Sequence, residues 1–384
     1  MKKQKILYIA NGNSIHDVKW MSFFSTQNER YTCFLLCDTM CELNAQTKST
    51  LAELNIHLVE QISPLSIKRL LRSWRAIRQF KKMVQDIKPD VIHVLFATPN
   101  ALWLNFTNTP SIITTRGSDI LRVIPELKAQ NGIKKPYFMY LFFRFKKAFK
   151  KAQFCTGTSQ LQVRSMKTTF SLPEPILIRT GVDVKKIIGS DYKLFLPKKL
   201  QGISYVISPR FMSPIYRIDM QLDAIEKLSD HTIKDLTFVF IRGVQYDAAY
   251  YATQLKRLES LKKEKGIKSI VLEYLSQDEI VAVLKHAHLC VMTPQSDGTP
   301  NSALEAMAAS CPLIVPNLPY DDDLFLGTCL MLNENTAESL AIAIETAIDN
   351  YPEGLIIHAS KQVLANGDRT NEMQKLTDLY DSMD

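Results

Sequence analysis

A stretch in the last third of the chain, Leu289–Tyr320, combines residue types that could bind a phosphorylated sugar. An apolar run is followed by a polar turn and then by an apolar helical pattern from Asn301. Ligands of parallel α/β sheets bind outside the carboxyl ends of strands, where the free amides of a helix N-terminus face an anion. Asp297 and Glu305 bracket this helix start, so their carboxylates could hold the hydroxyls of a sugar and of a ribose. The structural alternative, in which Asp297 or Thr299 caps the helix and Glu305 lies in solvent, stays open.

Short apolar runs alternate with helical patterns along the whole chain, which predicts parallel α/β architecture. The predicted strands are Lys5–Asn11, Tyr31–Asp38, Val91–Phe96, Ser111–Thr115, Phe154–Ser159, Ile176–Thr180, Ser204–Pro209, Leu236–Arg242, Ile270–Tyr274, Leu289–Thr293, Leu313–Pro316 and Cys329–Leu332. Two sets of about six strands predict two doubly wound domains, residues 1–190 and 191–365, with the stretch 184–203 as the linker. The last segment, 366–384, is predicted to be a helix that packs back on the first domain.

The composition excludes several classes of protein and of site. Only 13 glycines occur, the nearest pair eight residues apart, which excludes both the G-x-G-x-x-G fingerprint and a P-loop. The seven cysteines contain no C-x-x-C pair and fit reduced thiols in the cytoplasm. The start of the chain is basic and then only briefly apolar, which predicts a first strand rather than a signal peptide. No apolar run is long enough to span a membrane.

Charge is divided unevenly along the chain. Residues 1–190 carry 29 basic and 12 acidic side chains, net +17, whereas residues 191–384 carry 18 and 27, net −9. The excess is concentrated in two helical patterns, 68–88 and 134–151. The second has seven basic residues, no acidic residue and a row of aromatic residues, so it fits either an anionic membrane surface or a core helix with solvated lysines. Since no nucleic-acid-binding motif accompanies these charges, nucleic acid is not expected as a partner.

The residues after Asp297 resemble family 4 of the glycosyltransferases, the retaining enzymes of the GT-B fold that use nucleotide sugars. The family pattern is Glu-x7-Glu, then Ala-Met-Ala and Pro followed by two hydrophobic residues. Here Asp297 stands for the first Glu, Glu305 for the second, and residues 306–308 and 312–314 follow in register. Five further segments resemble family motifs in the right order: 9–20, 87–96, 114–119, 181–183 and 208–219. The resemblance implies two Rossmann-like domains that face a central cleft.

The resemblance also implies roles in the second domain. Arg210 would contact the donor diphosphate, and Arg217 would substitute for a lysine that the family has and this chain lacks at the usual spacing. Asp297 would bind the hydroxyls of the donor sugar, and Glu305 those of the ribose. Other implied donor-binding positions are Gly243, Tyr274 near the base, and the amides of Gly298, Thr299, Asn301 and Ser302. The acidic run 321–323 is interpreted as a solvated turn rather than a metal site.

In the first domain the resemblance implies an acceptor-binding side of the cleft. The residues there are Asn11, Gly12, Asn13, His16, Arg116, which replaces a common family histidine, and Asp119. Asp119 could equally cap the following helix, and His16 could be a capping or packing residue. Both structural alternatives stay open.

The implied reaction moves a hexose-type sugar from a nucleoside diphosphate sugar to a hydroxyl, with retention and without a metal or other cofactor. The positive first domain suggests an anionic acceptor, such as a glycan or a polyprenyl-diphosphate-linked oligosaccharide of surface polysaccharide synthesis. Such an enzyme would be cytoplasmic, with peripheral contact to the inner face of the membrane. Two alternatives remain: a non-catalytic scaffold that binds nucleotide sugars, and a GT-B epimerase.

Overall fold

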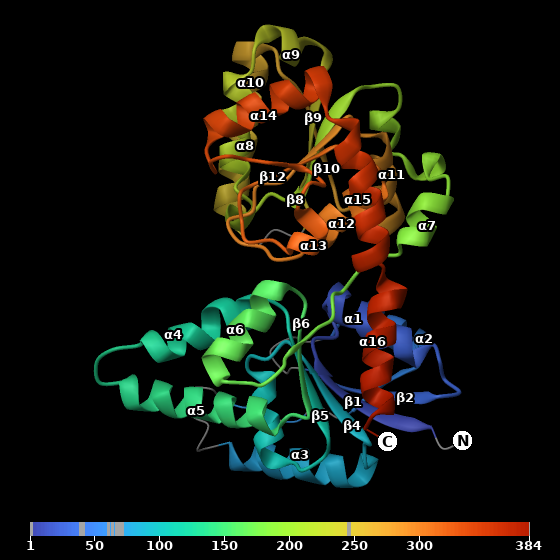
Figure 1. Ribbon diagram of the computed structural model, residues 1–384, viewed down its shortest axis with the longest axis vertical. Coiled ribbons are helices and arrows are strands. Elements are labelled where there is room, and N and C mark those ends of the chain that lie inside the picture. The colour runs from blue at the N-terminus through green and yellow to red at the C-terminus, as the bar shows by residue number, and fades with distance from the viewer. Residues whose placement is uncertain are drawn as a thin grey trace. The chain divides into compact units, whose positions relative to one another are not determined.

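The computed structural model describes residues 3–37, 43–59, 62, 65, 73–243 and 247–383. It divides the chain into two compact units, each shown in Figure 1. Unit 1 comprises Met1–Thr180 and Glu372–Asp384, and unit 2 comprises Gly181–Asn371. Some residues counted in the sequence lie outside the described residues: Lys2, Asp38, Cys41, Glu42, Glu60, Lys68, Arg69, Arg72 and Asp384.

Unit 1 contains one parallel sheet with the strand order β3-β2-β1-β4-β5-β6-β7. Its strands are β1 (Gln4–Ala10), β2 (Tyr31–Cys37), β3 (Ile56–Leu58), β4 (Val91–Leu95), β5 (Ser111–Thr115), β6 (Phe154–Gly157) and β7 (Ile176–Leu177). Its helices are α1 (Ile15–Ser25), α2 (Ala45–Glu53), α3 (Trp74–Ile87), α4 (Ile124–Ala129), α5 (Lys135–Lys151) and α6 (Gln160–Phe170). The order reverses between β1 and β4, and such a point is where doubly wound sheets bind ligands.

The end of the chain completes unit 1. Helix α16 (Arg369–Asp381) lies beside β1 and β2 (Figure 1). It buries Met373, Leu376 and Tyr380 in the cluster that also holds apolar side chains of β1 and β2. The Tyr380 hydroxyl hydrogen-bonds His93 Nδ1 at 2.5 Å and donates to the Tyr8 hydroxyl at 3.1 Å. These contacts tie the last helix to strands β1 and β4.

Unit 2 contains a second parallel sheet, of order β10-β9-β8-β11-β12-β13, which reverses between β8 and β11. Its strands are β8 (Tyr205–Phe211), β9 (Thr237–Ile241), β10 (Lys268–Leu272), β11 (Leu289–Val291), β12 (Leu313–Val315) and β13 (Leu330–Met331). Its helices are α7 (Val184–Gly189), α8 (Ile218–Lys227), α9 (Asp230–Asp235), α10 (Ala248–Lys265), α11 (Gln277–His286), α12 (Asn301–Ala308), α13 (Asp322–Phe325), α14 (Ala337–Asn350) and α15 (Glu353–Asn366). The architecture of two parallel-sheet α/β domains is therefore as predicted.

Local sequence explains where several of these helices begin and end. Helix α11 starts with a capping box, in which Ser276 accepts from the Glu279 amide and Glu279 accepts from the Ser276 amide. Helix α10 starts at an Asp247 cap and ends at Gly266 in the left-handed conformation. Strand β3 was missed by the sequence analysis, because its three residues are too few to show a period.

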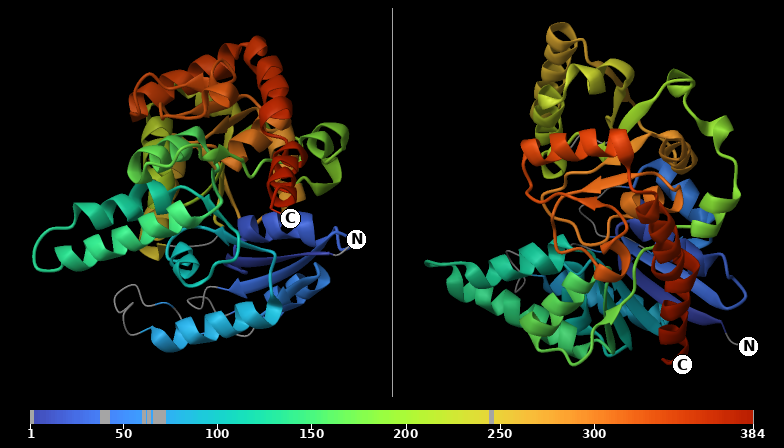
Figure 2. Two further views of the ribbon diagram at one scale, coloured as in Figure 1. Left: turned by 60° about the horizontal axis from the view of Figure 1, so that its bottom comes forward. Right: turned by 45° about the horizontal axis from the view of Figure 1, so that its top comes forward.

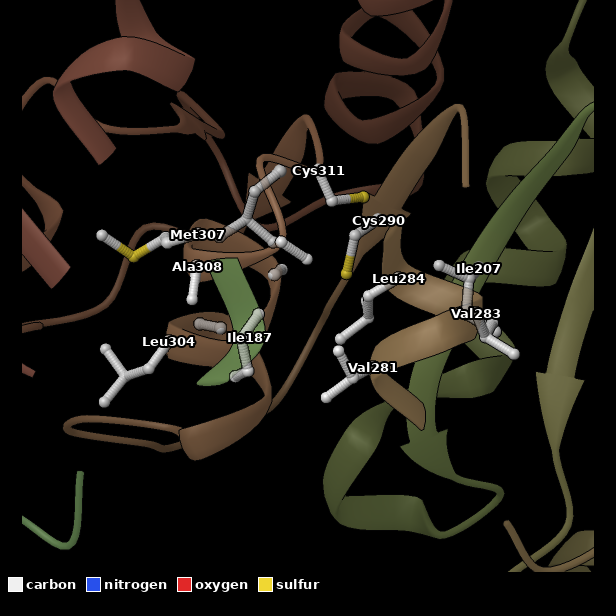
Figure 3. Packing of buried hydrophobic residues seen from close by; sticks show 14 of the residues in the cluster. Ile187, Ile207, Val281, Val283, Leu284, Cys290, Leu304, Met307, Ala308 and Cys311 are labelled. Carbon is white, nitrogen blue, oxygen red and sulfur yellow. The ribbon is translucent and has the colours of Figure 1, made fainter. Parts of the chain in front are cut away.

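The segment predicted as a linker is instead a packed part of unit 2. Val182 is bridged to Asp368, and Val184 is buried in the core of unit 2. Ile187 is buried in the same cluster as the side chains of α11 and α12 (Figure 3). The division therefore lies between residues 180 and 181 rather than at 190. The irregular spacing of apolar residues in 184–203 concealed the short helix α7, whose apolar residues pack against α12.

This division changes the charge of each part. Unit 1 has 28 basic and 15 acidic residues, net +13, and unit 2 has net −5. Helix α5 lies beside α4 (Figure 2) and buries Leu141, Phe145 and Phe149, as expected of a core helix. Its other face leaves Phe143 57% exposed. Among the described residues, no helix is both long and apolar enough to cross a bilayer.

Candidate active site

Arg210 reaches the edge of the unit 2 sheet because strand β8 is irregular there. Ser208 pairs with Phe240 and Phe211 pairs with Ile241, so two residues of β8 lie between neighbouring positions of β9. Pro209 cannot donate a hydrogen bond to the ladder, and the bulge re-aims the side chain that follows it. Arg210 thus lies at the carboxyl end of β8, beside the reversal of strand order.

Three groups hold the Arg210 guanidinium. Its Nη1 donates to Ser302 Oγ at 2.9 Å, and its Nη2 lies 3.4 Å from Asp297 Oδ2. The guanidinium carbon lies 4.2 Å from the centroid of the Tyr216 ring, a cation–π contact. Thr293 fixes the turn that carries Tyr216, because its hydroxyl donates to the Tyr216 carbonyl at 2.8 Å. Arg210 is thereby oriented next to the first turn of α12.

The turn before α12 has the form expected of an anion-binding helix start. Asp297 Oδ1 accepts from the Gly298 amide at 2.9 Å, and α12 has no side-chain cap. The capping alternative for Asp297 and Thr299 is therefore not what the structure shows. Instead Thr299 Oγ1 donates to Asp321 Oδ2 at 2.8 Å. Asp321 is fully buried, so the interpretation of this residue as part of a solvated turn is wrong.

Glu305 lies inside the protein rather than in solvent. It is 6% exposed on α12, and its Oε1 accepts from Gln277 Nε2 at 2.7 Å. Gln277 is the first residue of α11, which follows β10, so this carboxylate faces the β10 side of the sheet edge. Arg210 and Asp297 lie nearer the reversal between β8 and β11.

The remaining predicted donor residues are dispersed along the same edge. Arg217 has a different partner from Arg210. Its Nη1 donates to the Asn335 carbonyl at 3.2 Å, whereas Arg210 bonds to Ser302 and Asp297. Tyr274 is exposed two residues beyond β10, and Asn301 begins α12.

Gly243, two residues beyond β9, supports the Arg210 segment by close packing. It has φ +54°, and a Cβ there would lie 2.0 Å from Phe211 Cδ1. No larger residue would fit between the end of β9 and the Phe211 ring without displacing one of them. Because Phe211 directly follows Arg210 in β8, this packing helps to hold the Arg210 backbone in position.

Burial has the largest effect on the Asp297 carboxyl. It raises the pKa of Asp297, while Arg210 and the Gly298 amide act in the opposite direction. An uncompensated buried carboxylate is costly, so the nearby guanidinium stabilises the charged form. Among the described residues, no group of three or more His, Cys, Asp or Glu side chains is arranged to hold a metal ion.

Four of the predicted acceptor residues, Asn11, Gly12, Asn13 and His16, lie between the end of β1 and the first turn of α1. The Asn13 amide donates to Asn11 Oδ1 at 2.9 Å, and His16 is exposed on the first turn of α1. Gly12 and Asn13 line a hollow of about 250 Å³ between α1 and α2, together with Ile15, Val18, Lys19, Ser22, Gln46, Thr47, Thr50 and Leu51.

Arg116 and Asp119 are integrated into the interior of unit 1. Arg116 Nη2 lies 3.0 Å from Asp17 Oδ1, and its guanidinium stacks over Trp20 at 4.7 Å. Asp119 accepts hydrogen bonds from four backbone amides, those of Ala97, Arg116, Gly117 and Ile120. Burial raises the pKa of Asp119, and these amides oppose that shift. Its carboxylate therefore organises the loops after β4 and β5 rather than capping the helical segment Asp119–Val123, which has no side-chain cap.

Several residues of the site escaped the sequence analysis. Tyr216 and Tyr320 flank the Arg210 region, Gln277 holds Glu305, and Asp17 pairs with Arg116. Tyr216 falls within the segment 208–219 that resembled a family motif. The others come from different strands or helices, and no spacing along the chain marks such contacts.

Comparison with protein families gives two matches. The model described as "Glycosyl transferase 4-like" matches residues 5–153, and "Glycosyl transferases group 1" matches residues 202–360. No curated protein matches the sequence significantly.

Solved structures share the fold over the whole chain. A glycosyltransferase from Rickettsia africae has a TM-score of 0.75 at 14% identity, covering 100% of this chain and 99% of its own. Anabaena HepE, crystallised with UDP, has a TM-score of 0.73 at 14% identity, covering 99% and 100%. Sucrose-phosphate synthase from Thermosynechococcus elongatus has a TM-score of 0.70 at 15% identity, covering 99% of both chains. The two family models match in chain order, and the structure has two parallel-sheet domains. The chain therefore belongs to the group 1 (family 4) glycosyltransferases of the GT-B fold.

Proposed function

We propose that the protein is a retaining hexosyltransferase, which moves a sugar from a nucleoside diphosphate sugar to a hydroxyl of a glycan or lipid-linked oligosaccharide. The observation that carries the proposal is the placement of Arg210 beside the uncapped start of α12, with Ser302 and Asp297 around it. Guanidinium groups and helix N-termini are the usual partners of phosphate oxygens. Anabaena HepE was also crystallised with UDP-glucose, which makes UDP-sugars the first donors to test.

In the proposed step the bond between the anomeric carbon and the phosphate oxygen breaks, and its electron pair leaves with the diphosphate. Arg210 and the first amides of α12 would stabilise that negative charge. The acceptor oxygen then bonds to the anomeric carbon on the same face, and its proton passes to the departing phosphate oxygen. The configuration is retained, and no divalent metal is needed, so EDTA should leave the rate unchanged.

The acceptor is proposed to bind unit 1 and to be anionic. Unit 1 has a net charge of +13, and its hollow between α1 and α2 includes the predicted residues Gly12 and Asn13. A polyprenyl-diphosphate-linked oligosaccharide has both the negative charge and the lipid that such a surface favours. The enzyme would then work in the cytoplasm, at the inner face of the membrane.

A panel of nucleotide sugars tests the reaction. We expect one of them, with UDP-sugars tested first, to raise the melting temperature of the purified protein. With a lipid-linked acceptor present, free nucleoside diphosphate should be released. Binding without release or transfer in the presence of acceptor would favour the scaffold alternative, and a change of the sugar itself would favour an epimerase. No binding of any nucleotide sugar would refute the proposal.

Helix α5 carries the proposed contact with an anionic membrane. Tyr140, Phe143, Lys147 and Lys150 are exposed at spacings of three or four residues, which places them on one face of the helix. Ile133, in the loop before α5, is fully exposed beside two further lysines. Exposed aromatic and aliphatic side chains next to lysines are typical of helices that lie in the membrane interface.

Sedimentation with liposomes tests this contact. Binding should require an anionic lipid such as phosphatidylglycerol and fall with salt, because exposed charges are screened within about 10 Å at 0.1 M salt. The double variant Lys147→Glu, Lys150→Glu should lose binding, whereas Lys198→Glu, Lys199→Glu on exposed positions of unit 2 should keep it. Equal binding of both variants, or binding to neutral liposomes alone, would contradict the proposal.

A further inference from the structure

Tyr320 has a buried hydroxyl with no hydrogen-bond partner among the described residues. The side chain is 4% exposed, and its oxygen is buried. The large majority of buried polar side-chain atoms in proteins are paired, so an unpaired one needs an explanation. The ring is held in place by stacking on Phe325, with centroids 4.7 Å apart. The stacking therefore fixes where the hydroxyl oxygen lies.

The loop that carries Tyr320 is joined to the turn that precedes α12. Tyr320 lies in the loop after β12, next to Asp321, whose carboxylate binds the Thr299 hydroxyl at 2.8 Å. That hydrogen bond ties the Tyr320 loop to the turn containing Asp297. The charges of Asp297 and Arg210 also act on the pKa of Tyr320, the first raising it and the second lowering it, after the larger effect of burial.

The order of strands indicates which part of a donor would meet Tyr320. Along the sheet edge the order is β10, β9, β8, β11, β12. Glu305, the proposed ribose ligand, faces the β10 side through Gln277, and Arg210 lies at β8. Tyr320 follows β12, on the opposite side of Arg210 from the nucleotide. A donor that crosses the edge in this direction brings its glycosyl group to Tyr320.

We infer that the Tyr320 hydroxyl hydrogen-bonds the glycosyl group of the donor and thereby helps to select the sugar. This inference rests on the proposed function and deepens it. In the free protein the hydroxyl is desolvated and unpaired, so a sugar hydroxyl or ring oxygen gives it the partner that the protein does not. Because a site built around an unpaired polar group discriminates by hydrogen bonding, Tyr320 would favour sugars with an oxygen at the matching position.

The variant Tyr320→Phe tests the inference, with Tyr205→Phe as the matched control. Tyr205 is fully buried in the same unit, but its hydroxyl donates to the Val283 carbonyl at 2.7 Å. Tyr320→Phe should keep or raise the melting temperature of the free protein, since it removes an unpaired buried group. Tyr205→Phe should lower the melting temperature, since it removes a formed hydrogen bond.

Binding of UDP and of the UDP-sugar that wild type prefers then locates the contact. Tyr320→Phe should weaken the nucleotide sugar about 5- to 10-fold, the effect of one hydrogen bond, and leave UDP unchanged. Tyr205→Phe should change neither. Equal weakening of both ligands, or no weakening of the sugar nucleotide, would overturn the inference while leaving the proposed function intact. Failure of wild type to bind any nucleotide sugar would instead refute the proposed function.

Discussion

The role proposed for Glu305 predicts a specific coupling between this carboxylate and the ribose of the nucleotide. Glu305 is buried on α12 and accepts a hydrogen bond from Gln277 at 2.7 Å. Glu305→Gln keeps the shape and a hydrogen bond with Gln277 and removes only the charge. A hydrogen bond to a charged group contributes about 1.5–3 kcal/mol, so wild type should bind UDP about 10- to 150-fold more tightly than 2′,3′-dideoxy-UDP.

Isothermal titration of both nucleotides against both proteins forms a double-mutant cycle. In Glu305→Gln the penalty for removing the ribose hydroxyls should shrink to a few-fold, and UDP itself should bind more weakly. Glu264→Gln, at an exposed position of α10, controls for the loss of one negative charge. The same penalty in wild type and in Glu305→Gln would show that this carboxylate does not contact the ribose, and would refute the reasoning.

Three further predictions concern stability. Burial lowers the pKa of His93 to about 3, so below about pH 6.5 the unfolded chain takes up a proton that the native protein does not. The free energy of unfolding of wild type should therefore fall by about 2 kcal/mol more than that of His93→Gln between pH 7 and pH 5. Urea titrations at both pH values measure this difference. Gly243→Ala should lower the melting temperature more than Gly266→Ala, because both have positive φ but only the first places a Cβ against Phe211; equal effects would contradict the packing argument. Asp119→Asn should lower the free energy of unfolding by about 2–3 kcal/mol in the same titrations, because a side-chain amide cannot accept hydrogen bonds from all four backbone amides. An unchanged urea midpoint would show that these hydrogen bonds do not stabilise the protein.

Sequence patterns predicted the strands well because buried parallel strands are short apolar runs between helical patterns. β3 has only three residues and escaped. The segment 184–203 was misassigned because its apolar residues are irregularly spaced, although Val184 and Ile187 are buried in unit 2. Periodicity reports regular elements, and it is silent about irregular segments that pack.

The candidate site was only partly accessible from the sequence. The spacing of Asp297 and Glu305 around a helix start identified α12, because chemistry and local structure coincide there. The contact between Thr299 and Asp321 joins residues 22 positions apart on different loops. Because the sequence does not show this contact, Asp321 was wrongly interpreted as part of a solvated turn. Tyr320 carried no signal at all, since only its burial in the fold makes its hydroxyl notable.

The central claim is that Arg210 stabilises the departing diphosphate, and release of nucleoside diphosphate with acceptor present tests it most directly. Arg210→Ala should lower kcat/KM about 100- to 1,000-fold, the effect of removing one preorganised group that stabilises developing charge. The control is Arg257→Ala, which removes ion pairs with Asp223 and Glu226 on the helices of the same unit. We predict that reduction in the first variant and near-normal turnover in the second. Near-normal turnover of a folded Arg210→Ala variant would contradict the account.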